Sequence, residues 1–361
     1  MRLNMHKLKN KFKRLFMSAA TIGTACLLAG CGAGAAAGTD NSSVTESQSG
    51  VNGSEQENAS SDSQKLQIVA TIFPEYDWVK EILGDQADNV DLTLLLGNGT
   101  DMHSFQPTME DILKVSTCDL FIYVGGESDS WVADALKGAG NPDRKAINLM
   151  DVLGDQVKEE EIVEGMQDED GHTHEEEHTH DDDLEYDEHV WLSLKNASLF
   201  CDTIASILAD ADPEHSKLYQ QNADTYEERL AVLDQEYKTT VEQSQFKTVL
   251  FADRFPFRYL IDDYELTYYA AFTGCSAETD ASFETITFLA GKLDELKLPV
   301  VFTIENSDQK IAKAVIENTK TKDQKILSLN SMQSVTKKEV EEGTTYLSIM
   351  ENNLEILKEA L

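Results

Sequence analysis

The sequence alternates between short apolar runs and amphipathic segments, and it does so in two separate blocks. The first block contains β-branched runs such as 66–73 (LQIVATIF) and 120–124 (LFIYV), and the second contains 247–251 (KTVLF) and 300–304 (VVFTI). Short runs that are apolar throughout are typical of parallel strands buried between layers of helices. We therefore predict an α/β fold with two lobes of mostly parallel sheet flanked by helices.

The two blocks are separated by 194–243, whose pattern is almost entirely helical with an interruption near Asp212–Pro213. Because proline suits the first turn of a new helix, this stretch predicts a long helical spacer that joins the lobes. Ligands of open parallel sheets bind beyond the carboxyl ends of the strands. Two sheets that face each other therefore predict a site in the cleft between the lobes.

The N-terminus has the features of a bacterial export signal. A basic segment without acids precedes an apolar stretch shorter than a typical spanning helix, which ends in Leu28-Ala29-Gly30-Cys31 and resembles a lipobox. We predict a lipoprotein signal peptide at 1–30, a lipid on Cys31 and a flexible tether at 31–64. The lipid would anchor the protein to the outer face of the bacterial cytoplasmic membrane. The alternative is an ordinary signal peptide with an accidental cysteine.

Composition divides the remaining chain further. The patterns predict an N-terminal lobe at 65–193 that includes an acidic, histidine-rich insert at 159–188, linking helices at 194–245 and a C-terminal lobe at 246–361. The formal net charge of −36 excludes nucleic acid as a partner and favours the attraction of cations.

The cysteines beyond the lipobox are odd in number, so at least one has no partner within the chain. They are Cys118, Cys201 and Cys275. An extracytoplasmic location permits a disulfide. The absence of a Cys-x-x-Cys spacing argues against a thiolate zinc site or a redox motif.

The acidic insert contains four of the eight histidines of the chain: His172, His174, His178 and His180. A tract of imidazoles and carboxylates favours divalent transition metals. The stretch 174–178 matches H-E-x-x-H, but it lacks the buried helical face that a zinc protease needs. We therefore predict an accessory metal site of low affinity. The alternative is a loop without a role.

Two other histidines lie at edges of the first block. His103 lies in a loop directly after a strand, and His189 precedes the apolar Val190-Trp191-Leu192. Each is a candidate metal ligand, and the case for a shared site is stronger if both lie on the same side of the lobe. The alternatives are a surface residue for His103 and a semi-buried partner of Asp187 or Glu188 for His189.

Further candidates follow the strands of the second block. Asp253, Glu278, Glu305 and Asn330 all occupy carboxyl ends or the loops beyond them. We expect Asp253, Glu278 and Asn330 to be candidate ligands on the opposite side of the cleft. The alternative for Asp253, about equally favoured, is a helix cap or a salt bridge with Arg254. The alternative for Glu278 is a structural role in which it caps or braces its loop.

Several stretches together resemble the substrate-binding lipoproteins of zinc and manganese ABC importers, the cluster A-I binding proteins, and most closely their zinc type. They are TIFPEYDWVKEILGD, GNGTDMHSFQPTMEDI, the histidine-rich insert, DEHVWLSLKNA and TTYLSIMENNLEILKEAL. The resemblance covers 67–361. It implies two α/β lobes joined by a rigid helix, with a metal site in the cleft.

Position by position, His103 and His189 match the two metal ligands of the family's N-terminal lobe. The C-terminal lobe departs from the pattern. Relatives place a histidine or glutamate where this chain has Arg254, a cation that cannot bind a metal, so Asp253, another group or water would complete the site. They also commonly place an acid or histidine at Asn330, and many pair a cysteine near Cys275 with one where Met332 stands, so that bridge is absent here.

The resemblance implies a monomeric, non-enzymatic protein that captures Zn²⁺ and delivers it to the membrane permease of an ABC importer. Imidazole and carboxylate ligands suit Zn²⁺, although they do not exclude Mn²⁺. The alternatives are a binding protein of the same class with Mn²⁺ or Fe²⁺ as cargo, a surface adhesin stabilised by a metal, and a surface hydrolase. The last lacks a nucleophile–base set in the sequence.

Overall fold

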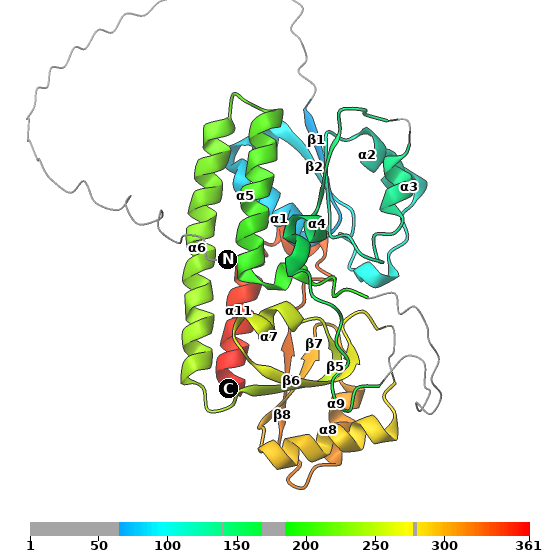
Figure 1. Ribbon diagram of the computed structural model, residues 1–361, viewed down its shortest axis with the longest axis vertical. Helices are drawn as coiled ribbons and strands as arrows, with labels where there is room; N and C mark the ends of the chain where they lie inside the picture. Colours follow the sequence, from blue (N-terminus) through cyan, green and yellow to red (C-terminus); the bar gives the residue numbers. More distant parts are fainter. Residues whose placement is uncertain (1–64, 139, 168–184, 277–279) are drawn as a thin grey trace, which may run out of the picture. The chain divides into compact units, whose positions relative to one another are not determined.

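The computed structural model describes residues 65–138, 140–167, 185–276 and 280–361, all within one compact unit (Figure 1). Several predictions fall on residues outside this part of the chain: the signal peptide, the tether with Cys31, the four histidines of the insert, and Glu278. Within the described part, no helix is both long and apolar enough to cross a membrane.

The N-terminal lobe is built on a parallel sheet with the strand order β2-β1-β3-β4. All four strands are short, and the two central ones, β1 and β3, are largely buried, as their apolar runs predict. The elements are β1 (Leu66–Ala70), α1 (Phe73–Leu83), η1 (Gly84–Asn89), β2 (Val90–Leu94), η2 (Met102–Ser104), α2 (Met109–Thr117), β3 (Leu120–Tyr123), α3 (Val132–Leu136), β4 (Lys145–Asn148), α4 (Leu149–Leu153), η3 (Gly154–Gln156) and η4 (Val190–Leu192).

The C-terminal lobe repeats this architecture with the strand order β6-β5-β7-β8, again with parallel pairs. Its elements are β5 (Thr248–Phe255), α7 (Arg258–Asp263), β6 (Thr267–Thr273), α8 (Phe283–Leu296), β7 (Val300–Ile304), α9 (Lys310–Glu317), β8 (Lys325–Leu329), α10 (Lys337–Glu341) and α11 (Tyr346–Ala360). The prediction of two α/β lobes with parallel sheets is confirmed.

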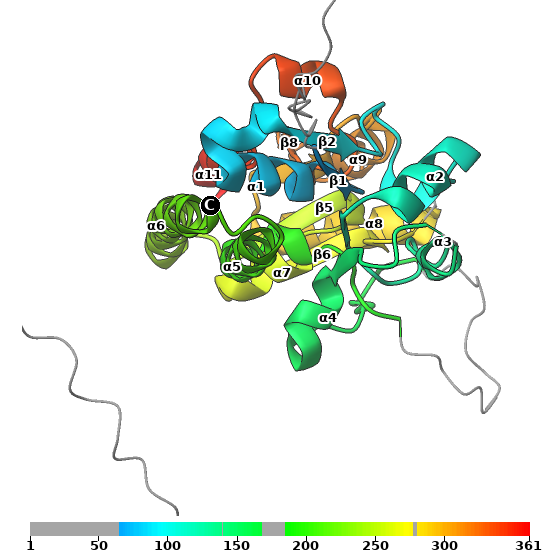
Figure 2. The same cartoon turned by 90° about the horizontal axis from the view of Figure 1, so that it is seen from above.

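Two long helices connect the lobes, α5 (Leu194–Ala211) and α6 (Ser216–Gln243). They pack against each other, and both also contact α1 (Figures 1 and 2). At 1.5 Å per residue, the 28 residues of α6 extend for about 42 Å. The helix is therefore long enough to flank both sheets, and α11 of the C-terminal lobe packs against it.

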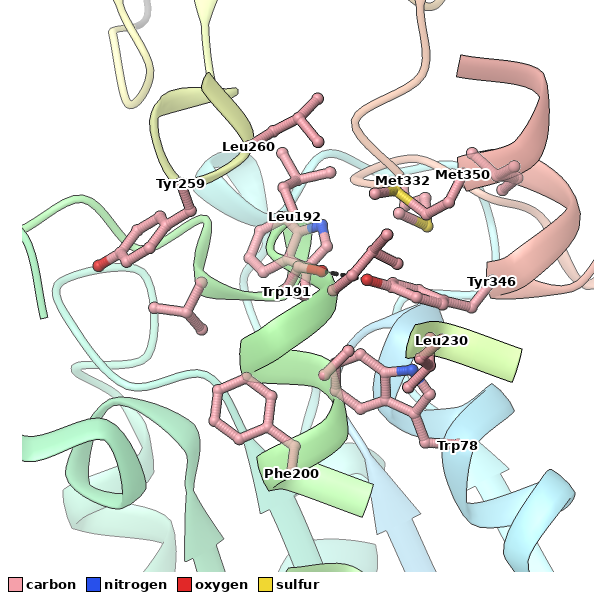
Figure 3. Packing of buried hydrophobic residues seen from close by; sticks show 14 of the residues in the cluster. Trp78, Trp191, Leu192, Phe200, Leu230, Tyr259, Leu260, Met332, Tyr346 and Met350 are labelled. Carbon is pink, nitrogen blue, oxygen red and sulfur yellow. Dashed lines mark hydrogen bonds between the residues drawn. The ribbon is translucent and has the colours of Figure 1, made fainter. Parts of the chain in front are cut away.

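The two lobes share one hydrophobic core, shown in Figure 3. Trp78 of α1, Trp191 of η4 and Tyr346 of α11 are all fully buried in it. The indole Nε1 of Trp191 donates to the carbonyl of Ser331 at 2.8 Å, and the Tyr346 hydroxyl donates to the carbonyl of Trp191 at 2.7 Å. Moving one lobe against the other would break these bonds and expose aromatic surface, so the arrangement is rigid.

Lys158 and the first part of the insert, residues 159–167, lie against the C-terminal lobe. The Lys158 amide donates to the Tyr259 hydroxyl at 2.9 Å, and the Gln167 amide donates to the carbonyl of Ala271 at 3.0 Å. Gly165 adopts a φ of 85°, and a Cβ there would meet the ring of Phe288 at 2.0 Å. The sequence assigned this stretch to the N-terminal lobe, because chain order does not show across which lobe a connection runs.

A buried carboxyl supports the first turn of α1. Glu75 is fully buried, and its Oε2 accepts hydrogen bonds from the amides of Thr71 and Ile72 and from the Thr71 hydroxyl. Its Oε1 has no hydrogen-bond partner among the described residues. Burial, followed by repulsion from Asp129, raises the pKa of Glu75 from 4.5 to about 8.

The raised pKa of Glu75 predicts a pH-dependent stability. The folded state holds its proton to higher pH than the unfolded state, so the stabilising contribution is complete below pH 4.5 and is lost as the pH rises through about 8. The free energy of unfolding of the wild type should therefore fall between pH 5 and 9. In Glu75→Gln, which has no proton to lose at this position, we expect this fall to be smaller by an amount on the order of a few kcal/mol.

Urea titrations across this pH range test the prediction. The exposed Glu228→Gln on α6 is the control, and it should leave the pH dependence as in the wild type. Equal pH dependence in Glu75→Gln and the wild type would contradict the assignment.

Candidate metal centre

His103 lies in the loop after β2, at the carboxyl end of the first sheet. Asp101 caps the short turn η2, and its Oδ1 accepts the His103 amide at 3.0 Å, while the neighbouring Met102 is buried in the core. The imidazole Nδ1 lies 2.8 Å from the Ser128 hydroxyl and 3.8 Å from Oε2 of Glu188. These polar neighbours fix the ring with Nε2 pointing away from them.

His189 lies directly before η4, and its side chain has no exposed surface. Its Nδ1 is 2.9 Å from Oδ1 of Asp187, which also accepts the His189 backbone amide at 2.9 Å. Because a carboxylate only accepts hydrogen bonds, Nδ1 is a donor to Asp187, so in the neutral ring Nε2 is the nitrogen with the free lone pair. Carboxylates that orient metal-binding histidines make this same contact.

The two imidazoles face each other. Their Nε2 atoms are 3.2 Å apart, and their ring centroids are 5.2 Å apart. Burial, followed by the proximity of His189, lowers the pKa of His103 to about 3. His103 is therefore neutral at physiological pH, the form in which an imidazole binds a metal.

Cys275 joins the two histidines from the C-terminal lobe. It follows β6, and one ligand atom from each of His103, His189 and Cys275 lies within 4.8 Å of the others. The Cys275 amide donates to Oε1 of Glu160 at 3.1 Å. Burial, followed by the charges of nearby acids, raises the pKa of the thiol well above its ordinary value.

Gly274 permits this close approach of the lobes. A Cβ at this position would lie 2.9 Å from Cε1 of the His189 ring and 2.9 Å from the carbonyl oxygen of Phe255. Gln333, in the loop after β8, is 3% exposed, and its Nε2 lies 3.5 Å from Nε2 of His103. The centre is thus formed by two side chains from each lobe.

Arg254 forms an ion pair across the cleft. Its Nη2 lies 2.6 Å from Oδ2 of Asp101, and its Nη1 lies 3.5 Å from the carbonyl of Ser276. Burial raises the pKa of Asp101, but the charge of Arg254 and its hydrogen bond outweigh burial and hold that pKa below its ordinary value. The arginine at the position of an expected ligand therefore connects the loop of His103 to the loop of Cys275.

The other sequence candidates brace the loops at the strand ends. The Asp253 carboxylate accepts the amides of Arg254 at 2.9 Å and Ile304 at 3.4 Å. The side-chain Oδ1 of Asn330 accepts the backbone amide of Met332. The backbone amide of Asn330 donates to Oδ1 of Asn353. A metal-binding role for Asp253 and Asn330 stays a prediction.

Sequence reasoning missed Cys275 and Gln333. The absence of a Cys-x-x-Cys spacing argued against a thiolate ligand, but that spacing detects only pairs of neighbouring cysteines. The available signal was the position of Cys275 directly after a strand of the second sheet. Cys118, Cys201 and Cys275 are all free in the structure.

Comparison with known protein families matches residues 68–360 to the family described as zinc-uptake complex component A, periplasmic (ZnuA). The chain belongs to this family. The resemblance inferred from the sequence is therefore confirmed.

Individual relatives carry the same description. The chain is 30% identical over 301 residues to the zinc-binding lipoprotein AdcA of Streptococcus pneumoniae, a match that covers 82% of this chain and 56% of AdcA. It thus spans about half the length of that relative. It is 29% identical to the high-affinity zinc uptake system protein ZnuA of Bacillus subtilis, over 86% of this chain and 92% of that protein.

The Zn(II)-bound ZnuA-like domain of Streptococcus pneumoniae AdcA has a similar structure. Its TM-score is 0.63 at 26% identity, and the match covers 82% of this chain and 99% of that domain. The two-lobed architecture is therefore shared with a domain that has been solved with zinc.

The Arg254–Asp101 pair predicts a measurable coupling between the lobes. Both side chains are mostly buried, at 18% and 23% exposure. A double-mutant cycle of Arg254→Ala and Asp101→Ala in metal-free protein should give a coupling of about 1–2 kcal/mol in the free energy of unfolding. The exposed pair Lys137–Asp134 is the control and should show no measurable coupling. A coupling no larger than that of the control pair would refute the bridging role.

Proposed function

We propose that this protein captures Zn²⁺ between its two lobes and delivers it to the membrane permease of an ABC importer. The observation that carries the proposal is a pair of imidazoles, that of His189 buried and that of His103 12% exposed, whose Nε2 atoms are 3.2 Å apart. Two nitrogens bound to one tetrahedral zinc at ~2.0–2.1 Å are about 3.4 Å apart. The histidines are thus already close to the spacing that the ion requires.

The surroundings of the site support capture rather than catalysis. His189 has no exposed surface, Gln333 is buried, and the Arg254–Asp101 pair crosses the cleft beside them. A catalytic zinc keeps a position open for water or substrate, whereas a closed site holds its ion. The family of zinc-uptake components, to which the chain belongs, supports the same reading.

A location outside the cytoplasmic membrane fits this role. We infer that a lipid on Cys31 anchors the protein there as a monomer, a reading supported by the lipobox and by the lipoprotein relative AdcA. The net charge of −36 favours the approach of cations. In this proposal, the histidines of the insert bind metal weakly as an accessory to the main site.

Removing either imidazole should abolish tight binding. We expect His103→Ala and His189→Ala each to lower zinc affinity by more than about 100-fold, because loss of even an outer partner of a metal ligand costs 10–100-fold. Chelator-competition titrations of each variant measure this loss. His215→Ala is the control, since His215 pairs with Asp212 at the start of α6. Unchanged zinc affinity in both site variants would refute the proposal.

Competition and growth assays separate the alternatives. Zn²⁺ should displace Mn²⁺ and Fe²⁺ from the wild type. Affinity for Mn²⁺ equal to that for Zn²⁺ would favour a binding protein with Mn²⁺ as its cargo. Deletion of the protein should impair growth in zinc-chelated medium, and wild type but not His103→Ala should restore it. Normal growth of the deletion strain would favour an adhesin.

A further inference from the structure

We propose that the thiolate of Cys275 is a third ligand of the captured ion, so that the site binds through two nitrogens and one sulfur and prefers thiophilic divalent ions to Mn²⁺. This inference rests on the proposed function and specifies its ligand set. It assigns the selectivity of the site to one side chain of the C-terminal lobe.

The first support is geometric. The ligand atoms of His103, His189 and Cys275 lie within 4.8 Å of one another. In a tetrahedral zinc site with Zn–N at ~2.0–2.1 Å and Zn–S at ~2.3 Å, sulfur and nitrogen ligands are about 3.6 Å apart. Side-chain adjustment of about 1 Å therefore suffices to bring three ligands to one ion.

The second support is the lone pair of His189. Its Nδ1 proton is directed to Asp187, so in the neutral ring the fully buried Nε2 is the atom that can bind an ion. The Nε2 of His103 faces it across 3.2 Å. A divalent ion between the rings can take a lone pair from each Nε2 when both imidazoles are neutral and protonated on Nδ1, and the thiol of Cys275 lies within 4.8 Å of a ring nitrogen of each.

The backbone around Cys275 is held in place independently of any ion. Glu160 accepts the Cys275 amide, and the missing side chain of Gly274 allows the strand end to reach the His189 ring. Cys275 is free, and Cys118 and Cys201 are buried in other parts of the core. The thiol is therefore not committed to a disulfide with either of them.

Binding of sulfur to the ion is a simple ligand exchange. The S–H bond breaks, the Zn–S bond forms, a water leaves the ion, and the proton passes to solvent, with no change of oxidation state. A bound divalent ion deprotonates a coordinating thiol outright. The amide of Gln333 lies beside the pair, with its Nε2 3.5 Å from Nε2 of His103, and it offers at most a weak oxygen ligand.

This donor set determines which ions fit. Thiolate and imidazole favour Zn²⁺, whereas Mn²⁺ is best served by carboxylate, carbonyl and water oxygens. Replacing the sulfur by a hydroxyl should therefore weaken zinc binding much more than manganese binding. We expect Cys275→Ser to lower zinc affinity by more than about 10-fold and to reduce the ratio of zinc to manganese affinity to a similar extent.

Cobalt substitution tests the sulfur ligand directly. Full-length wild type loaded with Co²⁺ should show sulfur-to-cobalt charge-transfer absorption in the near ultraviolet, together with visible ligand-field bands. Cys275→Ser should lose the charge-transfer absorption and keep the ligand-field bands, which shows that it is folded and still binds through its histidines. Cys118→Ser is the matched control and should retain both features.

The outcomes separate this inference from the proposed function. Wild type that binds Co²⁺ and Zn²⁺ without charge-transfer absorption, and Cys275→Ser with unchanged zinc affinity, would overturn the sulfur ligand and leave zinc capture standing. Wild type that binds neither ion would overturn both. A second measurement needs no variant: saturating Zn²⁺ should slow alkylation of Cys275 in the wild type, and equal rates with and without zinc would contradict ligation.

Discussion

The burial of Trp191 between the lobes is the contact on which the rest of the arrangement depends. Its indole donates to the C-terminal lobe, and its carbonyl accepts the hydroxyl of Tyr346. Two residues earlier in the chain stands His189, held by Asp187. The Asp187 carbonyl in turn accepts the Tyr259 hydroxyl at 3.0 Å. The orientation of one candidate metal ligand is therefore set by the same packing that joins the lobes.

An ion pair also holds the two lobes together at the cleft, in addition to the packing around Trp191. The Arg254–Asp101 pair lies between the loops of His103 and Cys275, where a metal ligand was expected. Burial and then the proximity of His189 are the main causes that lower the pKa of His103, and the charge of Arg254 adds to them. The arginine also holds the opposing loops together.

The sequence predicted the fold and one half of the candidate centre. Apolar strands alternating with helices are a local pattern, so both sheets could be inferred from it. His103 and His189 could be singled out because each lies at the edge of an apolar element. Cys275 and the bridge formed by Arg254 could not, because both depend on how the second lobe faces the first. The spacing of residues along the chain does not determine the distance between residues of the two lobes.

The contact of Gly274 with His189 has a consequence for how such a cleft can change. The width of the cleft at this point is limited by a single absent methyl group, since a Cβ would lie 2.9 Å from the imidazole. Any larger residue forces the strand end away from the histidine, and the sulfur of Cys275 moves with it. A substitution at this glycine would thus change the spacing of the candidate centre while leaving His103, His189 and Cys275 unaltered in sequence.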